Sequence, residues 1–160
     1  MIRPATIDDV PEIHAMIREL AEYEKAPHEV RVTEEQLRVA LFSDTPAAFS
    51  HIAEHEGAVA GFSLWFLTFS TWRGVHGIYM EDLFVRPEYR GSGYGGALMA
   101  ELARICDERG YQRLEWSVLD WNAPTIGFYD ALGAERQDEW VKYRLTDEPL
   151  RRLAVRATAS

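Results

Sequence analysis

Cysteine and long apolar runs are almost absent from the sequence. The single cysteine, Cys106, cannot form an intramolecular disulfide, which fits a reducing compartment. The longest apolar stretch, residues 59–69, has about half the length that a membrane-spanning helix needs. The first twenty residues carry several charged side chains and do not follow the pattern of a signal peptide. We therefore expect a cytoplasmic protein that does not enter a membrane.

An excess of positive charge is also lacking. The chain has 17 Lys and Arg residues against 26 Asp and Glu residues, which gives a formal net charge of −9. Because nucleic acids are bound through surplus Lys and Arg, this balance speaks against nucleic acid as the main partner. It favours a cationic substrate, although acidic charge also serves solubility.

The residue sets that hold metals or attack esters are missing as well. The five histidines include no pair at metal-ligand spacing and no cysteine partner, so we expect no bound metal. The sequence Gly-x-Ser-x-Gly does not occur, which leaves no case for a hydrolase with that nucleophile.

The length and the hydrophobic pattern predict one domain, residues 1–160, with mixed α/β structure. Helical spacing begins near Val10, and Thr33 and Gln36 have the spacing of a capping box that opens a second helix. Another helix follows a glycine-rich segment and ends at Gly110. The last helix is predicted over residues 123–133.

Strands are predicted where β-branched and aromatic residues cluster between turn signals. After a short extended piece at the start of the chain, these segments are residues 49–55, 58–69, 77–85, 113–119 and 140–145. The order is two helices, an antiparallel meander, and then alternating strands and helices. This order predicts a mixed sheet with helices on its faces.

The segment RPEYRGSGYGGALM, residues 86–99, places four glycines between an arginine and a helix. Glycine amides approach an anion closely, and a helix N-terminus adds a positive dipole end, so this loop should hold phosphate. A nucleoside triphosphate is excluded because no Gly-Lys-Ser/Thr ends the loop.

A dinucleotide is a second candidate for this loop. Gly91, Gly93 and Gly96 match G-x-G-x-x-G, and Glu115 lies where a ribose-binding acid belongs. However, that fingerprint normally opens a parallel sheet and turns directly from strand to helix, whereas a meander and the residues RPEYR precede the glycines here.

The third candidate is coenzyme A, through the pattern Arg-x-x-Gly-x-Gly formed by Arg90, Gly93 and Gly95. Main-chain amides can hold its diphosphate without a metal, and Arg90 adds charge-assisted hydrogen bonds. The residues predicted to surround the diphosphate are Arg90, Gly91, Ser92, Gly93, Tyr94, Gly95 and Gly96.

This loop, with its preceding strand and following helix, resembles the signature of the GCN5-related N-acetyltransferases (GNAT). Longer strings resemble the spermidine/spermine N-acetyltransferase branch, which includes enzymes acting on thialysine. These strings are RPAT near the start, Trp72-x-Gly, YMEDLFV before the loop, and WNAPTIGFYDALGA after the next strand.

The resemblance implies a GNAT fold: a mixed, mostly antiparallel sheet of six to seven strands, helices on both faces, and strands that splay at the acetyl-CoA site. It implies transfer of acetyl from acetyl-CoA to a primary amine of a small cationic substrate by direct attack in a ternary complex. A polyamine, a diamine or a thialysine-like amino acid would fit. It also implies a homodimer, in which residues 139–155 could reach across the interface.

Glu81 and Asp82 are carboxylates in an otherwise apolar strand. The resemblance implies that Glu81 takes the amine proton through water and that Asp82 holds the cation. Adjacent strand residues point to opposite faces, so both can serve one site only if the strand bulges there. The alternative is a solvent-facing pair. The main chain of Leu83, Phe84 and Val85 would bind the acetyl carbonyl and the pantetheine amides.

The remaining roles also follow from the resemblance. Tyr129, a phenol that stays protonated at neutral pH, would donate to the leaving sulfur. Asn122 would bind the cofactor, unless it only caps a helix. Trp72 could wall the substrate channel. Glu29, together with Glu22 and Glu24, could extend an acidic mouth, or these residues could form a solvated face.

Two other functions stay open at this point. One is a non-enzymatic acyl-CoA-binding sensor on the same fold, although both Tyr129 and Glu81 are present. The other is a nicotinamide-dependent oxidoreductase, which rests on the dinucleotide match of the glycines.

Overall fold

The computed structural model describes residues 1–158. They fall into two compact units, of which the first is Met1–Leu119 and the second begins at Asp120. Within the described residues, no helix combines the length and the apolar character that crossing a membrane requires.

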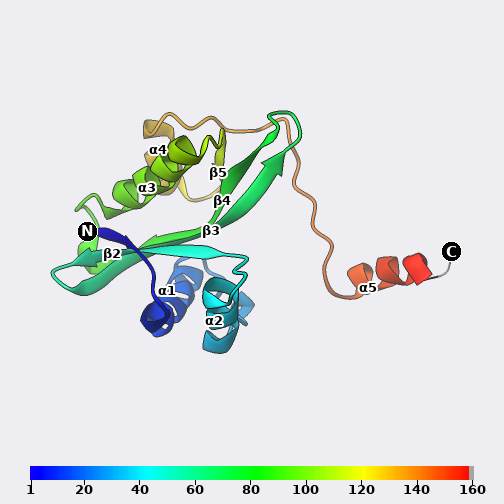
Figure 1. The fold of residues 1–160 in the computed structure, drawn as a ribbon, viewed down its shortest axis with the longest axis horizontal. Helices are drawn as coiled ribbons and strands as arrows, with labels where there is room; N and C mark the ends of the chain where they lie inside the picture. The colour runs from blue at the N-terminus through cyan, green and yellow to red at the C-terminus, as the bar shows by residue number, and fades with distance from the viewer. Residues whose placement is uncertain (159–160) are drawn as a thin grey trace. The chain divides into compact units, whose positions relative to one another are not determined.

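The first unit is built on one sheet, which has five strands among the described residues and the order β1-β2-β3-β4-β5 (Figure 1). The strands are β1 Ile2–Pro4, β2 Phe49–His55, β3 Ala58–Ser70, β4 Val75–Val85 and β5 Leu114–Trp116. Neighbours from β1 to β4 pair antiparallel, and β4 pairs with β5 in parallel. The predicted meander and mixed sheet are confirmed.

Helices cover both faces of this sheet, as predicted. They are α1 Val10–Tyr23, α2 Glu34–Phe42 and α3 Tyr94–Arg109. Figure 1 shows α1 and α2 on one face and α3 on the other. Two helix ends have the local features that the sequence predicts. At the start of α2, the Thr33 hydroxyl accepts a hydrogen bond from the main-chain N–H of Gln36 at 3.1 Å, which completes the predicted capping box. At its other end, α3 stops at Gly110, which has a left-handed conformation with φ 73°.

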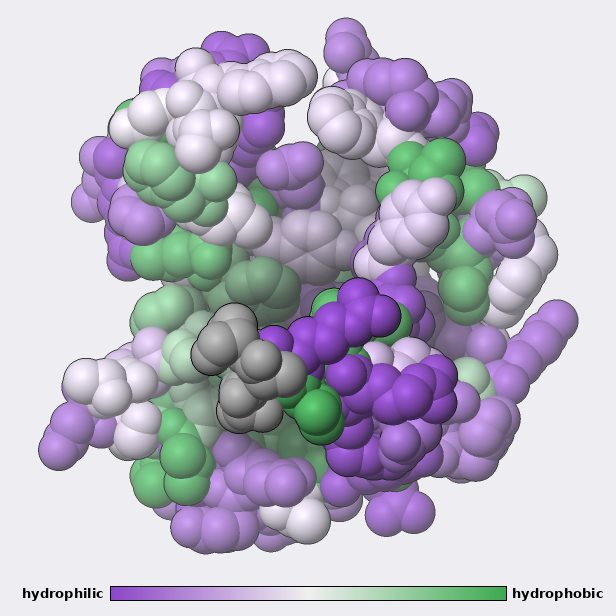
Figure 2. Space-filling model, turned by 90° about the vertical axis from the view of Figure 1, so that its right-hand side faces the viewer, coloured by the Kyte–Doolittle hydropathy of each residue, from purple (hydrophilic) through white to green (hydrophobic). Residues whose placement is uncertain are grey.

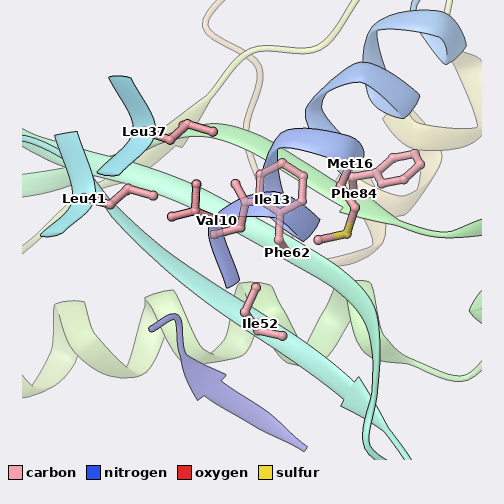
Figure 3. Packing of buried hydrophobic residues seen from close by; sticks show 8 residues of the cluster. All are labelled: Val10, Ile13, Met16, Leu37, Leu41, Ile52, Phe62 and Phe84. Carbon is pink, nitrogen blue, oxygen red and sulfur yellow. The ribbon is translucent and has the colours of Figure 1, made fainter. Parts of the chain in front are cut away.

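The core lies between the sheet and the pair α1 and α2 (Figure 3). Its buried side chains are Val10, Ile13, Met16, Leu37, Leu41, Ile52, Phe62 and Phe84. Phe84 of β4 lies directly across from Phe62 of β3 in the antiparallel ladder, and both are almost fully buried. This packing fixes the C-terminal half of β4 against the end of α1.

The second unit contains α4, Ala123–Ala131, and α5, Asp147–Val155. α5 was not predicted. Its apolar residues Leu150, Leu153 and Val155 are at least half exposed, and Figure 2 shows hydrophilic (purple) and apolar (green) side chains side by side on this helix. Spacing of three between leucines is typical of a helix with one apolar side.

The predicted strand over residues 140–145 is wrong, and the sheet therefore has five described strands rather than six to seven. This segment is irregular, and its apolar side chains Trp140, Val141 and Tyr143 are 65%, 76% and 91% exposed. Its alternating pattern suits a strand, but a strand forms only beside another strand, and this segment joins none of the described strands. The strand predicted over residues 113–119 is also shorter, Leu114–Trp116.

Candidate functional site

A β-bulge brings Glu81 and Asp82 to one side of β4. Leu64 of β3 pairs with Asp82, whereas the next residue, Trp65, pairs with Met80, so Glu81 is the extra residue in the ladder. An extra residue turns two consecutive side chains toward the same face. The sequence predicted that both carboxylates can serve one site only if the strand bulges. The bulge is present, and both residues line the same pocket.

This acidic pocket has a volume of about 580 Å³, which lies within the range of roughly 300–1,000 Å³ common for small-molecule sites. It is enclosed by the C-terminal half of α1, the loop of residues 26–32, the first turn of α2, and β4. Its polar side chains are Glu24, Glu29, Arg31, Gln36, Glu81 and Asp82, and its apolar ones include Ile17, Leu20 and Val32. The pocket can therefore enclose an alkyl chain while its carboxylates hold a cation.

The carboxylates of the pocket perturb one another. Burial, followed by the charges of Glu81 and Glu24, raises the pKa of Asp82 to about 7. Burial and the charge of Glu81 also raise the pKa of Glu24. The charges of these carboxylates repel one another, and a bound cation would relieve this repulsion. Perturbed carboxyl groups in a cleft are typical of functional sites.

The strands β4 and β5 separate beside the bulge. Their parallel pairing covers three residues of each strand and ends where Met80 meets Trp116. Beyond that point, residues 82–85 of β4 remain paired with β3, but none of the described strands pairs with their other edge. Apart from the oxygen of Val85, which accepts the Nε–H of Arg90, this edge is therefore open to an extended ligand that carries amide groups.

The glycine loop, residues 90–96, follows β4 and opens α3. Gly91 and Gly93 have φ angles of 82° and 84°, which favour glycine. The first helical bond runs from the amide of Ala97 to the oxygen of Gly93 at 3.0 Å, so the amides of residues 94–96 precede the intrahelical ladder. A Cβ built on Gly91, Gly93 or Gly96 would meet no atom within 4 Å. The protein itself thus fills no space in front of these glycines, which fits the approach of a diphosphate.

Arg90 connects this loop to the end of β4. Its Nε–H donates to the main-chain oxygen of Val85 at 2.8 Å. Its guanidinium also lies 5.5 Å from the ring centroids of Tyr23 and Phe84, within cation–π range. The sequence pattern predicts only a diphosphate contact for Arg90. Its packing role depends on residues far apart in the chain, which a local pattern does not show.

Other predicted site residues are not brought together with the pocket. Trp72 lies in the turn between β3 and β4, is 80% exposed, and does not line the acidic pocket. Six residues of β4 separate that turn from Glu81, which explains the distance from the site. Glu29 lines the pocket, whereas Glu22 does not. The carboxylate oxygen Oε1 of Glu29 lies 3.3 Å from Nε2 of His28.

Asn122 and Tyr129 belong to the second unit. Asn122 precedes α4 as its N-cap but makes no side-chain capping bond, and Tyr129 lies on that helix. Both are buried, with 5% and 9% of their surface exposed. Their expected contacts with the cofactor remain predictions, because the two units are not placed relative to each other.

The described residues contain no group of three or more His, Cys, Asp or Glu side chains that could hold a metal ion.

The sheet differs from the doubly wound parallel sheet in which the G-x-G-x-x-G fingerprint holds a dinucleotide, since β4 is antiparallel to β3. The dinucleotide alternative therefore has no structural support.

Comparison with known proteins agrees with the motifs. Residues 13–134 match the model of the acetyltransferase (GNAT) family. The chain is 39% identical to a thialysine N-epsilon-acetyltransferase from Bos taurus, with 96% of each chain covered. It is 30% identical to an L-ornithine N5-acetyltransferase from Arabidopsis thaliana, with 93% of this chain and 85% of that protein covered.

The fold is also found among solved structures. An integron cassette protein from the mobile metagenome of V. cholerae superposes with a TM-score of 0.80 and 28% identity, and the match covers 96% of both chains. Since the family model spans most of the chain and the relatives align over nearly all of it, this chain belongs to the GNAT acetyltransferase family and is an N-acetyltransferase.

Proposed function

We propose that the protein transfers the acetyl group of acetyl-CoA to a primary amine of a small cationic substrate held in the acidic pocket. The observation that carries this proposal is the bulge at Glu81, which turns two carboxylates of one strand into a pocket beside an open strand edge. The relatives named for thialysine and ornithine support an amine on a short alkyl chain as the acceptor. A polyamine or diamine has the same reactive group.

Acetyl-CoA supplies the acetyl group as a thioester, together with a thiolate that can leave. In the proposal, the open edge of residues 83–85 pairs with the amide groups of the pantetheine arm, as one strand pairs with another. The amides of the glycine loop hold the diphosphate at the start of α3. Both contacts use main-chain atoms, and the bond from Arg90 to Val85 keeps the two segments in register.

The amine has to lose a proton before it can attack. At neutral pH a primary amine with a pKa near 10 is free base to about one part in a thousand, which costs roughly 4 kcal/mol. Glu81, exposed at the bulge, takes this proton through water in our proposal. Asp82 and Glu24 hold the ammonium group before transfer, and its positive charge lowers their raised pKa values again.

Tyr129 is proposed as the group that protonates the leaving thiolate. A phenol keeps its proton at neutral pH and can donate it to sulfur. The support for this role is its place in the segment WNAPTIGFYDALGA and its burial on α4. Asn122, at the start of that helix, is proposed to bind the pantetheine arm.

A homodimer is also part of the proposal. Residues 140–145 alternate like a strand, yet the segment joins none of the described strands, and the side chains of Val141 and Tyr143 are exposed. A second copy of the chain would supply a neighbouring strand for this segment and would cover the apolar side of α5.

The test is thiol release from acetyl-CoA with a panel of amines that includes spermidine, putrescine, ornithine, lysine and thialysine. We expect turnover with at least one, and a loss of at least about a hundredfold in kcat for Glu81→Gln. Glu35→Gln, which removes an exposed carboxylate outside the pocket, should keep the full rate. A protein that binds acetyl-CoA, as seen by a raised Tm, but turns over no amine would be a sensor instead.

A further inference from the structure

One basic residue lines the acidic pocket. Among the described residues of its lining, Glu24, Glu29, Glu81 and Asp82 are acidic, and only Arg31 is basic. The Arg31 side chain is exposed, and none of the described carboxylates forms an ion pair with it. A pocket for a purely cationic ligand would gain nothing from this charge, because it would repel the ligand.

The main chain that follows Arg31 is fixed by hydrogen bonds. The ring nitrogen Nε2 of His14 on α1 lies 2.9 Å from the oxygen of Val32, within hydrogen-bond distance. Thr33 then opens α2 through its reciprocal bonds with Gln36. The main chain of Arg31 is thus held at the pocket, while its guanidinium makes no ion pair of the kind that holds Arg3, Arg38, Arg86 and Arg104.

We propose that Arg31 binds the carboxylate of an α-amino acid whose distal amine is the group that becomes acetylated. This inference rests on the proposed function and narrows its substrate class. A guanidinium presents two parallel N–H donors that match a carboxylate, so it is the side chain best suited to this contact. The α-ammonium group of the same ligand would lie near Glu24 or Glu29, and the distal amine near Glu81 and Asp82.

Arg31 would also act against the competing substrates. A diamine or polyamine of equal length carries hydrogen or an ammonium group where the amino acid carries its carboxylate. It would therefore gain no contact from Arg31 and would bring a like charge toward it. Discrimination of this kind combines attraction for one ligand with repulsion of another. The pocket would thus prefer lysine-like or ornithine-like amino acids to polyamines.

The experiment compares substrates that differ only in the carboxylate. L-lysine is paired with cadaverine and L-ornithine with putrescine. L-lysinamide carries a neutral amide in place of the carboxylate of lysine. We expect the unchanged protein to prefer each amino acid over its diamine by roughly tenfold or more in kcat/KM. Arg31→Gln should raise the KM for the amino acids by about that factor, without a matching change in kcat or in the KM for acetyl-CoA.

Three variants make the result specific. Arg31→Lys should restore part of the preference because it keeps the charge. Arg18→Gln removes an exposed arginine of α1 that does not line the pocket, and it should leave the preference unchanged. Equal losses for lysine and cadaverine in Arg31→Gln, or no loss for either, would overturn the role of Arg31 while the acetyltransferase proposal stands. If no amine is acetylated, both proposals are wrong.

Discussion

The Nε–H of Arg90 donates to the main-chain oxygen of Val85 at 2.8 Å, which ties the glycine loop to the last residue of β4. Because that strand also carries Glu81 and Asp82, one side chain links the proposed diphosphate site to the strand of the acidic pocket. The rings of Tyr23 and Phe84 flank the same guanidinium.

Arg90→Lys keeps the positive charge but loses the Nε bond and the planar contact with both rings. We expect the KM for acetyl-CoA to rise by about tenfold, since the lost hydrogen bond and ring contacts together contribute roughly 1–2 kcal/mol. The KM for the amine should change little. Initial-rate kinetics with each substrate varied in turn measures both values, and an unchanged KM for acetyl-CoA would contradict the role of Arg90.

Gly96→Ala separates stability from cofactor binding. Gly96 lies in the first turn of α3 with no positive φ, and a Cβ there meets no atom of the protein within 4 Å. Alanine should therefore stabilise the helix by about 0.5–1 kcal/mol and raise the Tm of the protein alone. The new methyl group would, however, stand in the path of the diphosphate.

The KM for acetyl-CoA of this variant is therefore expected to rise while its Tm rises too. Differential scanning calorimetry without ligand and a titration with coenzyme A supply the two measurements. Tighter coenzyme A binding together with the higher Tm would show that the glycine loop does not face the diphosphate.

Asp82→Asn tests the electrostatics of the pocket through pH. The carboxyl of Asp82 has a pKa of about 7, so its charge, and its attraction for an ammonium group, is present above pH 7 and is lost below it. The wild-type kcat/KM for the amine should rise as pH increases through about 7. The Asn variant should lose this step, and a profile that keeps it would assign the titration to another group.

The same substitution should change stability with the opposite sign. A carboxyl whose pKa is raised by folding favours the folded state in its protonated form, so its ionisation destabilises the fold as pH rises from about 4 to 7. Asp82→Asn removes that penalty. We expect it to increase the free energy of unfolding by roughly 1–3 kcal/mol at pH 8, and by less at pH 5. Urea unfolding at both pH values measures the difference.

The homodimer is tested at the exposed segment of residues 140–145. Val141 and Tyr143 are 76% and 91% exposed, so replacing both with aspartate should not unfold a single chain. Light scattering coupled to gel filtration should give twice 18.3 kDa for the unchanged protein and one chain mass for the double variant. Circular dichroism checks that the variant remains folded. A monomeric unchanged protein would rule out the dimer.

Much of the fold was predictable because it depends on local patterns. Some features depend only on residues that are near one another in the chain. These features are the capping box of Thr33 and Gln36, the end of α3 at Gly110, and the strand before the glycine loop. The pair Glu81 and Asp82 also gave a real signal. Two carboxylates in an apolar strand needed either a bulge or two different roles, and the bulge is present.

The rest depends on contacts between distant parts of the chain. The segment of residues 140–145 has a strand pattern, but pattern alone cannot supply the neighbouring strand that it needs. Arg31 was missed because nothing in its local sequence shows that the loop after α1 folds back over the pocket. Trp72 was predicted to wall the substrate channel from its position before β4. It lies in the turn before that strand and does not line the acidic pocket, and its role at the channel stays a prediction.

The most direct measurement is a crystal structure of the protein with a bisubstrate analogue, in which coenzyme A is joined through an acetyl linker to the distal amine of lysine. We predict the diphosphate at the amides of the glycine loop, the linked amine beside Glu81 and Asp82, and the lysine carboxylate at Arg31. A structure with the amine outside the acidic pocket and the diphosphate away from residues 90–96 would contradict the account.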